Sequence, residues 1–332
     1  MKKSVVDSAD NVTQSLNYKK LKAKSITFTR YWRFSSRSHE GAGFGMKRLV
    51  KKIVNDWFLS IAGLKVVADV SSFRPEQQSY LLDEEMIESR NARISDFLCE
   101  YFGSYGLNLD LSLCRNSVER YEQIFRDDRV SDLNGGMGFN NGLILFVLVT
   151  FFSPRRIIES GVWRGYTTIL LDEASSDDAT IHCYDINLDR NEYQSSKARY
   201  FEQDISENLE QSYEGFEFAF FDDHVAHFDR ISFCLQNKIK VIVVDDDVSF
   251  DQAHSDGWPP IPSASMVYNY DKGPHTFSWM FNGEKAEADI RGLDVSEIVR
   301  QYQYIPFPSL TKLTGYKDTS FTSVLVKREQ QD

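Results

Sequence analysis

Five short apolar segments of this sequence each end in an acidic residue or run into one. The acids are Glu159, Asp185, Asp204, Asp222 and the run Asp245–Asp247. Carboxylates brought close together repel one another unless a cation or protons intervene, and oxygen ligands suit Mg²⁺, Mn²⁺ or Ca²⁺. A metal held there would bind two substrate oxygens and lower the pKa of a hydroxyl. Each acid taken alone also fits a turn or a helix cap, because Asp is common at both.

The first of these acids opens a glycine-bearing turn, Glu159-Ser-Gly-Val-Trp-Arg-Gly-Tyr-Thr-Thr. Gly161 and Gly165 would let the backbone approach a ligand, and a helix that begins at Thr167 would present unpaired N–H groups. The turn lacks the Gly-Lys-Ser/Thr of a phosphate loop, and its Gly-x-x-x-Gly spacing differs from G-x-G-x-x-G. An acid before the first glycine suits a cationic or hydroxyl-bearing ligand better than a pyrophosphate.

The order of the segments predicts the elements that bring the acids together. A strand that ends in Glu159 is followed by candidate strands at 180–184, 198–202, 216–221 and 240–244, with helix-compatible segments at 166–175, 205–213 and 225–237. This alternation predicts a doubly wound, mostly parallel α/β sheet. Ligands bind at the carboxyl edge of such sheets. In dinucleotide-type sites an acid placed like Asp185 hydrogen-bonds ribose hydroxyls.

The flanking segments complete this arrangement. The apolar run Leu143–Phe152 is too short to span a bilayer, and we expect a buried helix that packs on the sheet. Asp294–Tyr302 predicts a helix, and Phe321–Lys327 predicts the last strand. The irregular segment Gln252–Lys272 comes after the fifth strand and the acids Asp245–Asp247 at its end. We expect it to form a substrate lid, or else a rigid surface loop with Trp258 tucked inward.

The domain organisation has three predicted regions: a polar, basic segment over 1–40, a mainly helical region over 41–139, and the sheet domain over 140–330. Residues 46–62 follow the rhythm of an amphipathic helix, with Lys and Arg on its other side. Such a helix packs on a domain core or lies in an anionic membrane interface. The segment 67–135 is expected to cap the site or to form a contact in a homo-oligomer.

The composition limits the classes of function. The chain has 332 residues, of which 42% are hydrophobic and 14% aromatic, and a formal net charge of −11; this indicates a folded protein. Nucleic acid is not an expected partner, because phosphate contacts need a basic face. The four cysteines form no C-x-x-C pair, and residues 1–40 lack the apolar run of a signal peptide. We therefore expect a cytoplasmic protein, peripheral to the inner face of the membrane if 46–62 binds there.

Residues 140–328 resemble the class I S-adenosylmethionine-dependent methyltransferases. The resemblance is carried by the Glu159–Thr168 turn, Asp185, Asp204, Asp222 and the Asp245–Asp247 run. Within that superfamily the chain is most similar to the metal-dependent branch around macrocin-type sugar O-methyltransferases and the cephalosporin hydroxylase family. It departs from the commoner pattern at Trp163, where many members place another glycine. The resemblance implies a seven-stranded Rossmann-like sheet whose last strand runs antiparallel.

The same resemblance implies roles for individual residues. The cofactor, S-adenosyl-L-methionine (SAM), would be bound by Glu159, Gly161, Trp163, Gly165, Thr167, Asp185 and Asp204. Asp185 would accept bonds from the ribose hydroxyls, and Asp204 would approach the adenine amino group. Mg²⁺, Mn²⁺ or Ca²⁺ would be held by Asp222, Asp245 and Asp246. Asp222 also belongs to the expected catalytic set, with His224 and His227 as candidates for the base or else as histidines without a catalytic role.

These features predict a divalent-metal-dependent O-methyltransferase acting on a sugar or similar polyhydroxylated acceptor, with the acceptor class taken from the resemblance. Two alternatives stay open. The run Asp245–Asp247 also resembles the D-x-D element with which glycosyltransferases hold Mn²⁺ and a nucleotide sugar, although Glu159 would repel the pyrophosphate. A non-catalytic descendant of the fold that scaffolds a larger assembly is the other alternative, because a fold does not fix a function.

Overall fold

The computed structural model describes residues 84–125, 136–208, 212–253, 259–281 and 283–328. The basic segment at 1–40, the amphipathic pattern at 46–62 and Trp258 lie outside the described residues, and their predictions stay predictions. The chain divides into two units, Met1–Val70 and Ser71–Asp332, and every described residue belongs to the second.

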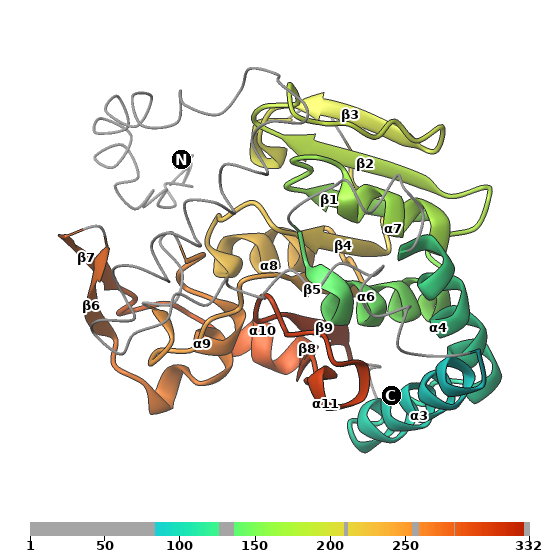
Figure 1. Cartoon of the computed structure of the whole chain (residues 1–332). Helices are drawn as coiled ribbons and strands as arrows, with labels where there is room; N and C mark the ends of the chain where they lie inside the picture. Colours follow the sequence, from blue (N-terminus) through green and yellow to red (C-terminus); the bar gives the residue numbers. More distant parts are fainter. Residues whose placement is uncertain (1–83, 126–135, 209–211, 254–258, 282, 329–332) are drawn as a thin grey trace, which may run out of the picture. The chain divides into compact units, whose positions relative to one another are not determined.

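A seven-stranded sheet organises the described residues, in the order β3-β2-β1-β4-β5-β9-β8 (Figure 1). Its strands are β1 (Arg156–Ser160), β2 (Thr180–Asp185), β3 (Ala198–Glu202), β4 (Phe218–Phe221), β5 (Val241–Val244), β8 (Tyr302–Pro306) and β9 (Ser323–Lys327). The first five pair in parallel, whereas β9 is antiparallel to both β5 and β8. The predicted mostly parallel, Rossmann-like sheet with an antiparallel last strand is confirmed.

The strand register aligns the carboxyl ends of the central strands. Ser160 at the end of β1 lies opposite Tyr184 and Phe221, and Phe221 lies opposite Val244 at the end of β5. The chain therefore leaves β1, β2, β4 and β5 at one edge of the sheet. The strand order changes direction at β1, and doubly wound sheets bind ligands at such a switch point.

Helices cover both faces of the sheet. They are α3 (Glu84–Ser104), α4 (Leu111–Phe125), α6 (Gly138–Phe152), α7 (Tyr166–Ala174), α8 (His227–Gln236), α9 (Ala264–Tyr268), α10 (Ser296–Gln301) and α11 (Thr311–Thr314). One buried cluster joins α3, α4, α6 and α7 to the sheet, and a second joins α8, α9 and α10 to it. Ile157 and Ile158, which are neighbours in β1, belong to different clusters, as the alternation of side chains along a strand requires.

Helix α6 is buried because its sequence is apolar on every side, which confirms the helix expected at 143–152. Two buried asparagines in its first turn fasten it to the chain that leads into β9. Asn140 Nδ2 donates to the Tyr316 carbonyl at 3.0 Å, and Asn141 Nδ2 donates to Thr322 Oγ1 at 2.9 Å. Across the described ranges, no helix combines the length and the apolar character needed to cross a membrane.

Four segments differ from the expected elements. In the helix expected at 205–213, the described residues form only the turn η4 (Ile205–Glu207), which Asp204 caps and after which Asn208 has left helical geometry. The segment 252–272, expected to be irregular, contains α9 and the turn η6 (Tyr270–Lys272). Strand β8 and the hairpin of β6 (Thr276–Phe281) and β7 (Glu284–Asp289) are additions to the predicted set.

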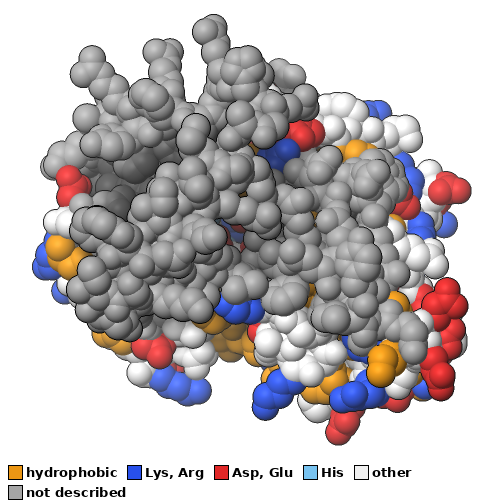
Figure 2. All heavy atoms as spheres, in the orientation of Figure 1, with side chains coloured by type: hydrophobic (Ala, Val, Ile, Leu, Met, Phe, Trp, Pro, Cys, Tyr) orange, Lys and Arg blue, Asp and Glu red, His pale blue; other side chains and the backbone are white. Residues whose placement is uncertain are grey.

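The surface charges are mixed where they are visible. On the face drawn in Figure 2, the described Lys and Arg side chains are interspersed with Asp and Glu. Such a distribution is typical of a solvated surface.

Candidate active site

The turn between β1 and α7 approaches the chain after β4 closely. Gly161 has φ +94°, and a Cβ on it would lie 2.1 Å from the Asp222 carbonyl oxygen, so this position requires glycine. Gly165, at φ +90°, directly precedes α7. Trp163 between them is also left-handed, with φ +45°, and its side chain is 43% exposed. The backbone thus keeps a glycine-like conformation at the position where the sequence departs from the superfamily pattern, and strain of this kind is typical of functional sites.

Asp185 binds this turn directly. Its Oδ2 accepts the N–H groups of Val162 and Trp163, each at 2.9 Å, and its Oδ1 accepts the Asn187 N–H at 2.9 Å. A carboxylate has about four lone-pair positions, so one remains for a ligand hydroxyl. Ile186 beside it is a large apolar residue that is 80% exposed. Ile186 directly follows this acid and was not among the site residues predicted from the sequence.

Glu159 lies in the interior of the fold beneath the turn. Its Oε2 accepts from Thr168 Oγ1 at 2.7 Å and from Cys183 Sγ at 3.1 Å. Its Oε1 is buried and has no hydrogen-bond partner among the described residues. Burial raises the pKa of Glu159 to about 7. A buried carboxylate oxygen without a partner costs free energy, and a cationic or hydrogen-bond-donating ligand group would relieve that cost.

Asp204 is part of a charged network that ties the edge of the sheet to α8. The buried Arg230 donates to Asp204 Oδ2 at 2.6 Å and to Asp223 Oδ2 at 2.8 Å. Ser160 Oγ at the end of β1 also donates to Asp223 Oδ2, at 2.6 Å. Burial raises the pKa of Asp204, but the bonds from Arg230 outweigh it and leave that pKa below its ordinary value. Asp204 therefore anchors α8, and its expected role at the adenine stays a prediction.

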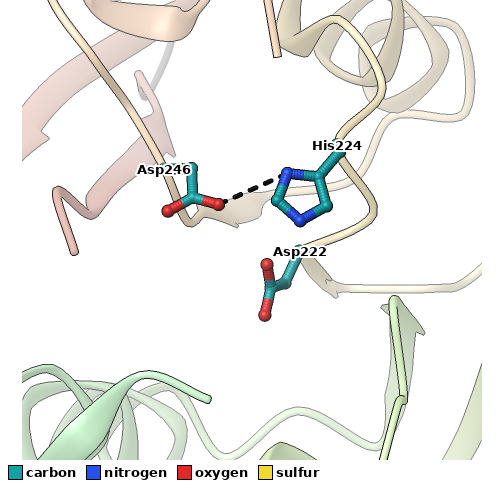
Figure 3. A group of neighbouring side chains, drawn as sticks. All are labelled: Asp222, His224 and Asp246. Carbon is teal, nitrogen blue, oxygen red and sulfur yellow. Dashed lines mark ion pairs between the residues drawn. The ribbon is translucent and has the colours of Figure 1, made fainter. Parts of the chain in front are cut away.

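Asp222, His224 and Asp246 bring three ligand atoms together (Figure 3). One atom of each residue lies within 4.8 Å of the other two, and His224 Nδ1 is 3.5 Å from Asp246 Oδ2. Asp222 follows β4 and Asp246 follows β5, so the two strand ends supply both carboxylates. His224 and Asp246 have φ +54° and +57°, and left-handed backbone in residues other than glycine concentrates at functional sites.

The electrostatics of this cluster favour a bound positive charge. Burial, together with the nearby carboxylates Asp245, Asp246 and Asp223, raises the pKa of Asp222 well above its usual range. Acidic groups in that position retain protons or take up a cation. The two carboxylates suit Mg²⁺, Mn²⁺ or Ca²⁺, whereas the imidazole is a ligand more typical of Zn²⁺ or Fe²⁺. The donor set is therefore compatible with the expected divalent cation.

Asp245 and Asp247 are engaged elsewhere. Asp245 Oδ1 accepts the hydroxyls of Ser320 and Thr322, and burial raises its pKa. Both oxygens of the buried Asp247 are occupied by partners from three segments, namely the Ser265 N–H and the hydroxyls of Tyr304 and Ser323. Two of the three expected metal ligands, Asp222 and Asp246, thus lie together with His224. Asp245 Oδ1 is bound by the chain before β9, and the expected role of Asp245 as a metal ligand stays a prediction. A D-x-D chelate would need Asp245 and Asp247 to share one cation, and their separate partners disfavour it.

His227 occupies the first position of α8 and is 2% exposed. Its Nδ1 accepts the Ala264 N–H at 3.2 Å, so the ring presents only Nε2 for further chemistry. His227 is outside the three-residue cluster. Its expected role as a base stays a prediction, and His224 is the histidine that stands beside the acids.

Comparison with solved structures finds several methyltransferases that are similar to this chain at low identity. No protein-family model matches the chain, and no curated protein sequence matches it significantly. The O-methyltransferase of Bacillus cereus in complex with SAH (S-adenosylhomocysteine) is similar in structure at 15% identity, with a TM-score of 0.34, over 69% of this chain and 97% of that chain. The O-methyltransferase TomG of Streptomyces achromogenes, involved in tomaymycin synthesis and solved with SAM, gives 17% identity and a TM-score of 0.37, over 70% and 96%.

A third similar structure is the SAH-bound methyltransferase PaMTH1 of Podospora anserina, at 14% identity and a TM-score of 0.37, over 64% of this chain and 87% of that chain. Likeness at these values assigns no activity to the chain. The proposal below therefore depends on the chain's own residues.

Proposed function

We propose that the chain is a SAM-dependent O-methyltransferase with a divalent metal site, acting on a hydroxyl of a sugar or other polyhydroxylated acceptor. One observation carries this proposal: the glycine turn suited to the cofactor touches the backbone of Asp222, whose side chain belongs to the metal-type cluster. Methyl transfer requires the methyl donor and the acceptor oxygen to be held next to each other in line. A cofactor turn and an oxygen-binding cluster that meet at one residue provide that arrangement.

The residues around the turn fit the chemistry of SAM. The unpartnered Glu159 Oε1 would accept a bond from the cationic methionine end, because a buried carboxylate gains most from a charged donor. Asp185 keeps a lone pair for a ribose hydroxyl beyond its three bonds to backbone N–H groups. The exposed side chains of Ile186 and Trp163 offer apolar surface for the adenine ring.

The cluster residues fit a divalent cation. Asp222, His224 and Asp246 would hold it, and the half-exposed His224 side chain leaves coordination positions open to acceptor oxygens. A cation bound there would polarise the acceptor hydroxyl and lower its pKa. The left-handed backbone of His224 and Asp246 aims both side chains at the common centre seen in Figure 3.

The same residues support a second mechanism without a metal. His224 Nδ1 lies 3.5 Å from Asp246 Oδ2, and a carboxylate beside an imidazole orients it and stabilises its protonated form. His224 would then take the acceptor proton through its other nitrogen. This candidate differs from the first in one consequence, because it needs no cation for turnover.

Metal binding separates the two mechanisms. Titration of the purified chain with Mn²⁺, followed by electron paramagnetic resonance of the free ion, is expected to show one binding site that is lost in Asp246→Asn and in Asp222→Asn. Asp178→Asn is a matched control, since Asp178 is exposed at the opposite edge of the sheet. If the Asp222→Asn chain binds Mn²⁺ as the unaltered chain does, the metal assignment is wrong and the His224 mechanism stands alone.

A further inference from the structure

A separate cavity opens at the carboxyl edge of the sheet beside the acids. Its volume is about 360 Å³, and the chain after β8, the chain before β9 and the residue Asp247 line it. Cavities that bind small ligands begin at about 300 Å³. The cavity and the cluster share one segment, because Asp247 of the lining directly follows Asp246 of the cluster and two lining hydroxyls bind Asp245.

Five of the seven hydroxyl groups that line this cavity donate their protons to other groups of the protein. Ser320 and Thr322 donate to Asp245, and Tyr304 and Ser323 donate to Asp247. Thr319 donates to the Met137 carbonyl at 2.7 Å. A hydroxyl has a single proton and two lone pairs. These five side chains can therefore only accept hydrogen bonds from a ligand.

The remaining polar lining strengthens this preference. Asn141 Nδ2 donates to Ser320 Oγ at 3.0 Å and to Thr322 Oγ1 at 2.9 Å, so both of its N–H bonds are used within the wall. The described residues that line the cavity include Asp247 and Asp318, and none of them is Lys or Arg. An anionic ligand would meet two negative charges and few donors, whereas a ligand rich in hydroxyl or amino donors would meet acceptors on several sides.

Apolar surface lies beside these acceptors. Phe321 is 43% exposed, and Phe307, Pro306 and Pro308 also line the cavity. A saccharide ring has donor groups around its rim and C–H bonds on its faces, so it matches both kinds of surface. Close packing of the C–H groups against these rings would add dispersion energy.

We propose that this cavity binds a saccharide ring that is neutral or carries an amine, and that it rejects rings bearing phosphate or carboxylate. The assignment of this ring to the methyl acceptor rests on the proposed function, in which the neighbouring cluster would hold the reacting hydroxyl. The preference of the cavity for donor-rich, non-anionic rings follows from its own side chains. The cavity is thus the proposed acceptor subsite, and the acceptor is neutral or positively charged.

Saturation-transfer difference NMR on the full chain tests the cavity, with glucose, glucosamine and glucuronate offered at equal concentration and inorganic phosphate as a competitor. Glucose and glucosamine are expected to receive saturation, and glucuronate is expected to bind about tenfold more weakly or not at all. Phosphate is expected not to displace the sugars. Equal binding of glucuronate and glucosamine, or displacement by phosphate, would overturn the inference.

Two variants locate the binding. Phe321→Ala should weaken the sugar signal, and Ser309→Lys, which places a cation on an exposed lining residue, should favour glucuronate over glucosamine. Ser104→Lys adds the same charge to an exposed position on α3 and should change neither. If Ser309→Lys leaves the binding of glucuronate relative to glucosamine unchanged, as Ser104→Lys should, the proposed site is wrong.

Calorimetry with SAH on the same samples separates this inference from the proposed function. SAH binding without any sugar signal overturns the cavity inference and leaves the methyltransferase proposal standing. A sugar signal with the stated preference but no SAH binding supports the cavity and overturns the methyltransferase proposal.

Discussion

Glu159 is a buried carboxyl whose effect on the stability of the fold depends on pH. Its carboxyl is fully buried, one oxygen has two donors, and the other has none among the described residues. Such a group is tolerated in a folded domain when protonation or a ligand compensates it. Without a ligand, the unpartnered oxygen of Glu159 lowers the stability of the folded protein, and a bound cationic group would restore part of that stability.

The titration of Glu159 predicts a stability change with a defined sign. The pKa rises from 4.5 in a free side chain to about 7, so the folded state binds the proton more tightly. The resulting stabilisation is complete below pH 4.5 and is lost as the pH rises through 7. The difference corresponds to about 3 kcal/mol of folding free energy.

Glu159→Gln removes this titration while keeping the shape of the side chain. Across that pH range the melting temperature of the unaltered chain is expected to fall relative to that of the Gln variant, because only the former loses a proton at this position. Thermal unfolding of both proteins over a pH series measures the difference. Parallel curves would show that the pKa of Glu159 is the same in the folded and unfolded states.

Elements meet at the carboxyl edge through charged contacts as well as through packing. Arg230 of α8, 3% exposed, joins Asp204 at η4 to Asp223 after β4. Removing one member of a buried ion network leaves uncompensated charges and costs about 3–5 kcal/mol. The network therefore fixes α8 against the loops that carry the cluster.

Arg230→Met is expected to lower the free energy of unfolding by that amount, about 3–5 kcal/mol, measured by urea unfolding. Arg300→Met is the control: Arg300 pairs with Glu297 on the exposed side of α10, and surface pairs contribute about 1 kcal/mol or less. Equal urea midpoints for the two variants would contradict a structural role for the Arg230 network.

The sequence pattern located the elements that have strong local signals. Strands β1 to β5 are short apolar segments bounded by turn residues and acids, and the structure places each within about two residues of its predicted bounds. Strand β8 was missed because Tyr302 follows α10 without a turn residue, so the helix was expected to include it. In the helix predicted at 205–213, the described residues beyond Glu207 are not helical, since a good cap at Asp204 does not ensure that the helix continues.

Only the site residues that lie at the ends of strands could be predicted from the sequence. Asp222 and Asp246 meet because β4 and β5 are neighbours, and the sequence showed both acids. His224 belongs to the cluster because His224 and Asp246 have left-handed backbone, which no sequence pattern predicts. Asp245 is taken by hydroxyls 75 and 77 residues further along the chain, and such distant partners become visible only once the chain is folded.

The whole molecule carries a formal net charge of −11. The glycine turn after β1, the cluster of Asp222, His224 and Asp246, and the cavity beside Asp247 all lie at the carboxyl edge of its sheet. SAM is cationic, so an acidic domain would attract it and repel phosphate-rich ligands. Among the described residues, the cavity lining includes neither Lys nor Arg, so the same preference would apply to the proposed acceptor.

The most direct test of the methyltransferase account is isothermal titration of the purified chain with SAH, with and without Mn²⁺, and with a UDP-sugar as the comparison ligand. We expect micromolar binding of SAH, on the order of 8 kcal/mol, with no binding of the UDP-sugar. Asp185→Asn should weaken SAH binding, whereas Asp246→Asn should leave it unchanged. Silence with SAH together with Mn²⁺-dependent binding of the UDP-sugar would contradict the account, and silence with both ligands would point to a non-catalytic scaffold.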